Sequence, residues 1–314
     1  MRLFLGCSFV FICSYLTSGQ KVTNTNHFHS EISFTSSPRE WSFSNLLEVD
    51  TSGGHLQGIQ QYRHGKKDYY FVSGSSANYS YLGLIAKEVN EVLRIEKLFD
   101  APLRHAGGFQ ICQNYLAIGV EDNVERNRSK VCIYDISGVP DFSTIPVYTI
   151  ERSGTFERAT AGCVALARLN NKWLLVVGDW NTRHLDFYIS VDLEIANGFT
   201  LEKTIVVNDI GRKDWSDEQW LPYQNINLFI SDSTLFLCGL GISQGKNTMD
   251  LFQIGSWHEH IFHLRKLARY QMKNTGGSFS WAAGVVFEET FPWEIFSTER
   301  NLQGITRIYS YSRE

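Results

Sequence analysis

Several patterns that point directly to a function are missing from this 314-residue chain. It has no run of Lys or Arg and its net charge is -4, so neither nucleic acid nor an anionic membrane surface is indicated as a partner. It contains no Gly-x-Ser-x-Gly, His-Glu-x-x-His or P-loop motif. The usual signatures of serine hydrolases, zinc peptidases and nucleotide-binding proteins are therefore absent.

Long apolar runs are also scarce. Arg2 precedes an apolar and small stretch from Leu3 to Leu16, and Thr17-Ser18-Gly19 follows it. This stretch is short for a bilayer span and ends in small residues, which favours a secretory signal peptide over residues 1–19. We expect a secreted or periplasmic protein with no transmembrane segment after signal removal, an N-terminal extension over residues 20–38 and one domain over residues 39–314.

The composition favours strands. Hydrophobic residues make up 43% of the chain and aromatic residues 14%, and aromatic side chains suit half-buried pleated surfaces. After the signal peptide four cysteines remain, none with CxxC spacing and all in apolar, strand-like runs: Cys112, Cys132, Cys163 and Cys238. Export permits disulfides, but we expect buried free thiols.

A repeated order of segments organises the domain. Each segment has a polar or glycine lead, an apolar strand, a short turn, a second strand, a longer loop and two further strands. The five segments span residues 55–98, 105–151, 162–207, 224–267 and 279–311. The leads of the first two share His, Gly and Gln at the same places, as His55-Leu56-Gln57-Gly58-Ile59-Gln60 and His105-Ala106-Gly107-Gly108-Phe109-Gln110 show.

The last segment lacks an outer strand, and residues 41–49 form one spare strand before the first segment. A strand from the N-terminus that completes the last unit would close a ring and remove an exposed edge. This organisation resembles the β-propeller superfamily. The resemblance implies an all-β fold, a five-bladed β-propeller of four-stranded antiparallel blades closed by the N-terminal strand. A β-sandwich or jelly roll is the alternative fold, and six blades the alternative count.

The loop lengths predict which face carries the site. Turns between the first and second strands are short, whereas loops on the opposite face are long, as at residues 120–130, 152–161 and 208–223. Long loops on a rigid scaffold commonly carry function. On that face we expect five candidate catalytic residues: His55, His105, Glu121, Asp122 and Asp179. Seven further residues are candidates for ligand binding: Gln57, Arg104, Arg158, Trp180, Gln224, Trp281 and Arg300.

These residue types suit three kinds of chemistry. Paired carboxylates with a histidine suit acid–base work on a sugar. Histidines with carboxylates suit a metal, whose presence and identity stay open. Arginines and tryptophans suit binding of an anion or a sugar face. The sequence most favours an exported protein that binds a small polar molecule or glycan at the mouth of the central channel. A carbohydrate-directed hydrolase or lyase and a protein-interaction platform are the alternatives.

Overall fold

The structure is a computed structural model, and it describes residues 21–22, 34, 37–231, 233–259, 261–273, 276–287 and 293–312. The predicted signal peptide, residues 1–19, lies outside the described residues and stays a prediction. Within the described part no helix is long and apolar enough to cross a membrane. Four short 3-10 turns are the only helical elements described: Trp180–Thr182, Ile195–Asn197, Val207–Asp209 and Trp257–Glu259.

The strands pair into antiparallel four-stranded units, which we number in chain order. Unit 1 contains β3 (Leu56–His64), β4 (Lys67–Ser75), β5 (Tyr79–Ala86) and β6 (Glu91–Asp100). Unit 2 contains β7 (His105–Cys112), β8 (Tyr115–Glu121), β9 (Arg128–Asp135) and β10 (Tyr148–Ser153). Unit 3 contains β11 (Cys163–Arg168), β12 (Trp173–Gly178), β13 (His184–Ser190) and β14 (Phe199–Val206).

The remaining units follow the same plan. Unit 4 contains β15 (Asn225–Ser231), β16 (Thr234–Ser243), β17 (Lys246–Gly255) and β18 (His263–Met272). Unit 5 contains β19 (Ser278–Val286), β20 (Glu294–Thr298), β21 (Gly304–Ser312) and β2 (Arg39–Asn45). A two-residue strand, β1 (Lys21–Val22), pairs in parallel with β15. The order of strands along the chain is therefore that of the predicted repeat.

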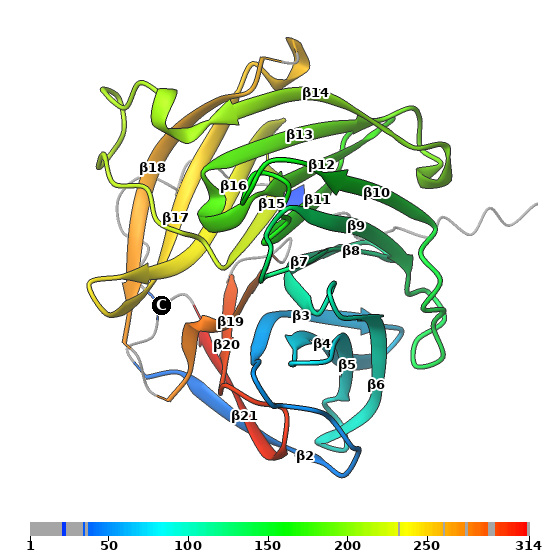
Figure 1. The fold of residues 1–314 in the computed structure, drawn as a ribbon. Coiled ribbons are helices and arrows are strands. Elements are labelled where there is room, and N and C mark those ends of the chain that lie inside the picture. Colours follow the sequence, from blue (N-terminus) through cyan, green and yellow to red (C-terminus); the bar gives the residue numbers. More distant parts are fainter. Residues whose placement is uncertain are drawn as a thin grey trace, which may run out of the picture.

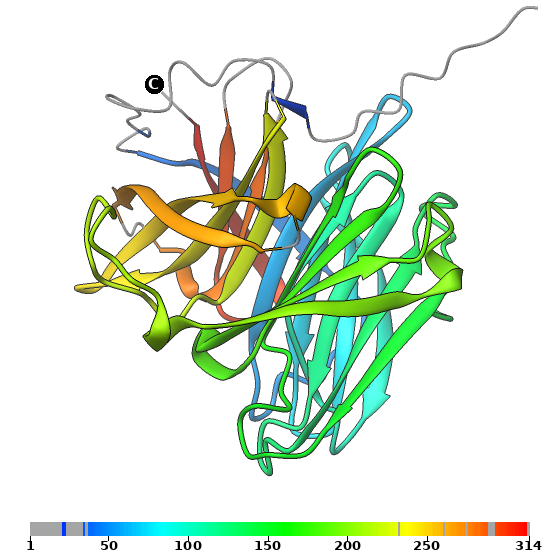
Figure 2. The same cartoon turned by 90° about the horizontal axis from the view of Figure 1, so that it is seen from above.

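The first strands of the units meet in the middle of the molecule. β3 contacts β7, β7 contacts β11, β11 contacts β15, β15 contacts β19, and β19 contacts β3. Figures 1 and 2 show the units side by side around this convergence. Glycine permits the closest approaches, because a Cβ on Gly284 would lie 1.6 Å from the carbonyl oxygen of Ile59. We call the convergence of these five strands the axis.

Amide side chains fill the axis and link the units. Gln110 accepts hydrogen bonds from the backbone N–H groups of Leu166 and Leu228, and it donates to the carbonyl of Leu228. Asn225 donates to the carbonyls of Phe109 and Ala283. Gln110 uses both its donor and its acceptor atoms, and Asn225 uses its donor, to bond backbone groups of neighbouring inner strands.

The hydrophobic core is divided among the joins between units. Five clusters of buried residues each combine side chains from two neighbouring units, including one cluster between unit 5 and unit 1. Trp173 and Trp293 are buried in two of these clusters and so pack between units. The four cysteines are buried and unpaired, as predicted.

Units 5 and 1 are joined at both their inner and their outer strands. β2 pairs with β21 from Arg39 to Asn45. At the outer edge Ser44 pairs in parallel with Glu91 of β6, and at the inner edge Ala283 pairs with Gly58 of β3. The eight strands of these two units therefore form a closed series of pairings, which the sequence did not predict.

Candidate functional site at the axis

Two histidines from neighbouring units approach each other at one end of the axis. His55 directly precedes β3, and His105 begins β7, where it pairs with Ser75 of β4. The centroids of the two imidazole rings are 6.5 Å apart, and the ring of Trp281 lies 5.3 Å from that of His55. The matching leads of the first two repeats thus place equivalent side chains together. We call this end of the axis the mouth.

His55 is held as a neutral imidazole. Its Nδ1 lies 2.6 Å from the carbonyl oxygen of Leu56, and Gln57 Nε2 lies 3.1 Å from its Nδ1 and 3.2 Å from its Nε2. With Nδ1 donating to the carbonyl, Nε2 is left to accept from the amide. Burial lowers the pKa of His55, and the nearby His105 and Arg300 lower it further against the opposing effect of the Leu56 carbonyl. Gln57 in turn accepts a hydrogen bond from Gln224 across the axis.

The second histidine faces a buried carboxylate. Glu121 ends β8, is 1% exposed, and accepts a hydrogen bond of 2.8 Å on Oε2 from the Ala161 backbone N–H. Its Oε1 lies 3.2 Å from His105 Nδ1, but the two atoms do not meet hydrogen-bond geometry, and neither has another partner. A buried carboxylate oxygen without a hydrogen bond is costly, so this pair needs a functional or structural reason.

A second histidine–carboxylate pair lies in unit 3. Asp179 accepts a hydrogen bond from the backbone N–H of His184, and its Oδ2 lies 2.5 Å from His184 Nδ1. Burial raises the pKa of Asp179, and the His184 contacts offset only part of that effect. Glu121 and Asp179 both act electrostatically on the buried Cys163 thiol, so the two pairs flank the start of β11.

Two predicted site residues have structural partners instead. Asp122 accepts backbone hydrogen bonds from Val124 and Glu125 and pairs with Arg128, so it caps the turn after β8. Arg158, expected to clamp an anion, binds both oxygens of Asp186 at 2.5 and 2.7 Å. Both carboxylate oxygens of Asp122 are therefore engaged within its own loop, and the donors of Arg158 face a carboxylate of the protein itself.

Trp180 directly follows Asp179 and packs against a charged loop. The guanidinium of Arg126 lies 3.9 Å from the Trp180 ring centroid and 5.7 Å from that of Phe156. Glu157 fixes this arrangement by pairing with Arg126 at 2.7 Å and with Arg183 at 2.5 Å. Phe156 is 61% exposed, so an apolar ring edged by charged groups faces solvent here.

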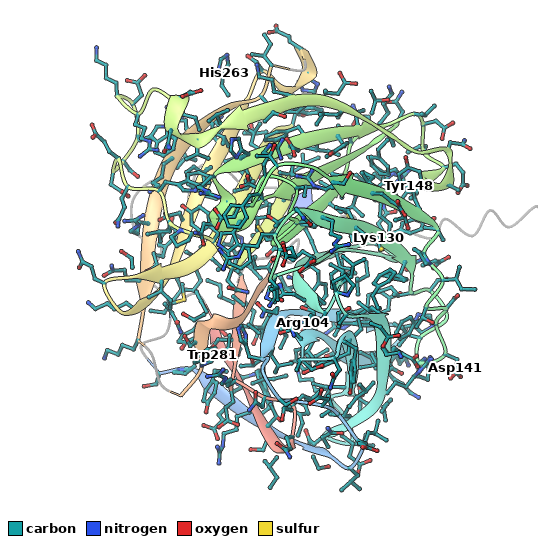
Figure 3. The ribbon with its side chains drawn as sticks, viewed as in Figure 1. Arg104, Lys130, Asp141, Tyr148, His263 and Trp281 are labelled. Atoms are coloured by element: carbon teal, nitrogen blue, oxygen red, sulfur yellow. The ribbon has the colours of Figure 1, made fainter. Side chains whose placement is uncertain are left out.

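The last two predicted ligand-binding residues are cationic and lie near the histidines. Arg104 precedes His105 and donates to Asn123 Oδ1 and to the Ala77 carbonyl. Arg300 is exposed, and its guanidinium lies 4.8 Å from the Trp281 ring centroid. Figure 3 labels Arg104 and Trp281, which both lie near the middle of the molecule.

Sequence reasoning missed several residues that shape this region. Asp186 accepts hydrogen bonds from Arg152, Arg158 and Thr204 while being 1% exposed. The sequence does contain a sign of this role, because Asp186 is an acidic residue inside the apolar run His184-Leu185-Asp186-Phe187. A carboxylate buried in such a strand needs a charged or hydrogen-bonding partner. His184 and Arg126 carried no comparable signal, because their partners come from loops whose folding the pattern does not predict.

Clusters that could hold a metal ion are absent from the described part of the chain. Among these residues no group of three or more His, Cys, Asp or Glu is placed to hold a metal ion. A cavity of about 290 Å³ does lie at the opposite end of the axis, lined in part by Cys112, Leu169, Ile230, Trp257 and His258. It contains none of the candidate catalytic residues.

Comparison with known proteins gives distant structural similarity only. No family model matches the chain, and no curated protein matches it. The catalytic domain of a Coprinopsis cinerea GH62 α-L-arabinofuranosidase shares 12% identity and a TM-score of 0.49, with 88% of this chain and 98% of that chain covered. A GH43 β-xylosidase/α-arabinofuranosidase from a compost microbial metagenome shares 10% identity and a TM-score of 0.48, with coverages of 87% and 94%. Similarities this distant do not show that this chain shares the activity of either protein.

The chemistry available at the mouth follows from its own groups. If His105 Nδ1–H faces Glu121, then His105 Nε2 is free to accept a proton, and the carboxylate stabilises the imidazolium that results. The neutral His55 lies beside it, with its ring nitrogens in contact with the Leu56 carbonyl and the Gln57 amide. Trp281 supplies an apolar ring, and Gln57 and Gln224 supply amide donors and acceptors. This set can bind a polar molecule and move a proton on it.

Proposed function

We propose that this chain is an exported, closed five-bladed β-propeller that hydrolyses a carbohydrate at the mouth. The ring of contacts among the first strands, a core cluster at each join and the pairing of β2 with β21 support the closed propeller. The apolar segment before Thr17 supports export. The hydrolase rests on the chemistry of the mouth.

The observation that carries the proposal is the pair formed by His105 and Glu121. Both Glu121 Oε1 and His105 Nδ1 are buried without a hydrogen-bond partner, which costs on the order of 1–3 kcal/mol per group. An active site justifies that cost, because catalytic hydrogen bonds often tighten only when substrate is bound. Asp122 and Asp186, by contrast, are fully engaged in capping and ion pairing.

In this proposal the two histidine–carboxylate pairs divide the proton transfers. The His105–Glu121 pair takes a proton from the attacking water. The Asp179–His184 pair, whose carboxyl has a raised pKa, supplies the proton for the departing sugar oxygen. Water thereby adds across the glycosidic C–O bond, and both groups return to their starting protonation when the protons exchange with solvent.

The test compares Glu121→Gln with Glu151→Gln on a panel of chromogenic glycosides and plant and microbial polysaccharides. Gln keeps an oxygen for the Ala161 N–H but removes the charge beside His105, so we expect kcat to fall by about 100-fold or more with folding retained. Glu151 is an exposed partner of Lys130, so its variant should keep full activity. Unchanged turnover in the Glu121→Gln protein would contradict the proposal.

Binding without turnover is the second candidate. It is favoured by one observation: Trp281 lies against His55 and under the Arg300 guanidinium, an arrangement that suits recognition of a polar ring. If the wild-type protein binds a glycan in calorimetry, shows no product by chromatography after long incubation, and loses that binding in Trp281→Ala, then this second function replaces the first.

A further inference from the structure

Two arginines at the mouth differ from their neighbours in lacking a carboxylate partner. The other arginines on this face of units 2 and 3 each pair with Asp or Glu at 2.5 to 3.1 Å: Arg126, Arg128, Arg152, Arg158 and Arg183. Within the described part of the chain Arg104 and Arg300 have no such pair. Their positive charges therefore have no carboxylate within ion-pair distance, whereas each of the five neighbouring arginines contacts one.

Neutral groups hold Arg104 in place. Its Nε donates to Asn123 Oδ1 at 3.1 Å and its Nη1 to the Ala77 carbonyl at 2.8 Å. These acceptors fix the plane of the guanidinium without neutralising it, and they leave Nη2 without a partner among the described residues. A fixed guanidinium loses little conformational entropy when it binds an anion, so the group is prepared for an acidic ligand.

Arg300 is placed on the other side of the histidines. Its carbonyl accepts a hydrogen bond of 2.8 Å from the Leu56 backbone N–H, which ties it to the start of β3. Its guanidinium lies 4.8 Å from the Trp281 ring centroid, and that ring lies 5.3 Å from His55. The same positive charge contributes to lowering the pKa of His55, which places Arg300 within electrostatic reach of the mouth.

We propose that the carbohydrate taken at the mouth is acidic, and that Arg104 and Arg300 bind its carboxylate or sulfate group. The inference rests on the proposed function and specifies its substrate class. Arginine suits this task because its fork of N–H donors makes paired, charge-assisted hydrogen bonds to carboxylate and sulfate oxygens. The protein as a whole has a net charge of -4, so an acidic ligand is drawn to these local charges and not to the surface in general.

The experiment measures binding and hydrolysis of three oligosaccharides matched in length: neutral, uronic-acid-containing and sulfated. The proteins are wild type, Arg104→Gln, Arg300→Gln, Arg104→Lys and the control Arg265→Gln. Arg265 lies exposed on β18 and contacts Gln253, without an acidic partner among the described residues and outside the mouth. Folding of every variant is checked by its melting temperature.

We expect the wild-type protein to prefer an acidic oligosaccharide over the neutral one. Arg104→Gln and Arg300→Gln should each weaken acidic-ligand binding by about 10- to 100-fold and leave neutral-ligand binding almost unchanged. Arg104→Lys should bind the acidic ligand more tightly than Arg104→Gln does, and Arg265→Gln should bind it as the wild type does. Added salt should reduce the preference for the acidic over the neutral oligosaccharide. A preference for the uronate over the sulfated ligand identifies the carboxylate as the source of charge, and the reverse identifies the sulfate.

Failure of the charge inference and failure of the hydrolase proposal give different results. If neutral and acidic oligosaccharides are hydrolysed equally well, the charge inference is wrong and the hydrolase stands. If acidic oligosaccharides bind through Arg104 and Arg300 but none is cleaved, the charge inference stands and the hydrolase is wrong. If the Gln variants lose neutral and acidic ligands to the same extent, or if no oligosaccharide binds, the charge inference is overturned.

Discussion

Replacing Asp186 by Asn should destabilise the protein strongly, because this buried carboxylate is the ion-pair partner of two arginines in unit 3. Asp186 is 1% exposed, and the Arg152 and Arg158 side chains are 8% and 31% exposed. Removing one partner of a buried pair costs about 3–5 kcal/mol. Since Arg158 keeps partial contact with water, we expect the loss of stability to lie at the lower end of this range, at about 3 kcal/mol. For a domain of this size that lowers Tm by roughly 6–12 °C.

The assay is urea and thermal unfolding beside a matched control, Asp68→Asn. Asp68 pairs with Arg63 at 2.7 Å on the turn between β3 and β4, but the arginine is 61% exposed, so the control should lose no more than about 1 kcal/mol. Equal losses in the two variants would refute the reasoning.

The dependence of this stability on pH provides a further check. Burial raises the pKa of Asp186, but the hydrogen bonds and charges of Arg158 and Arg152 outweigh that effect, and the net pKa is lowered from 3.8. Its contribution is therefore present above the unfolded pKa and is lost as pH falls through the lower folded value. In Asp186→Asn that acid-dependent loss should disappear, while Asp68→Asn should retain it.

Three other predictions concern the axis and the core. The His55 pKa is lowered by burial, so stability should rise with pH from its folded value to about 6.5, and an NMR titration should give a pKa below 6.5; a higher value contradicts the assigned environment. Gly284→Ala should disrupt folding, because its Cβ would lie 1.6 Å from the Ile59 carbonyl oxygen, whereas Gly211→Ala, with open space around its Cβ, should melt like the wild type. Thiol reagents should label the native protein far more slowly than the urea-unfolded protein, and fast native labelling would contradict burial of Cys112, Cys132, Cys163 and Cys238.

The strands were predictable because their pattern is local. Apolar runs separated by short turns marked the units, and the spare segment at residues 41–49 overlaps β2, which pairs with β21. The approach of His55 and His105 was also predictable, since equivalent positions of neighbouring repeats lie side by side at the axis. Similarly, the buried cysteines followed from their apolar neighbours.

The roles of the charged residues were harder to predict, because they depend on which loops meet. Arg158 and Asp186 are distant from one another in the repeat, and only folding of the loop before β11 brings them together. Arg126 was not among the predicted site residues, yet it contacts the rings of Trp180 and Phe156 and binds Glu157. The spacing of residues along the chain does not predict contacts between loops. The sequence analysis therefore named Arg158 as a candidate and did not name Arg126.

The most direct test of the account is a crystal structure of the Glu121→Gln protein with an acidic oligosaccharide bound. We predict the sugar at the mouth, with a glycosidic oxygen or its attacking water within hydrogen-bond reach of His105 and the acidic group between Arg104 and Arg300. An oligosaccharide bound only in the cavity at the other end of the axis, beside Trp257 and His258, would contradict it.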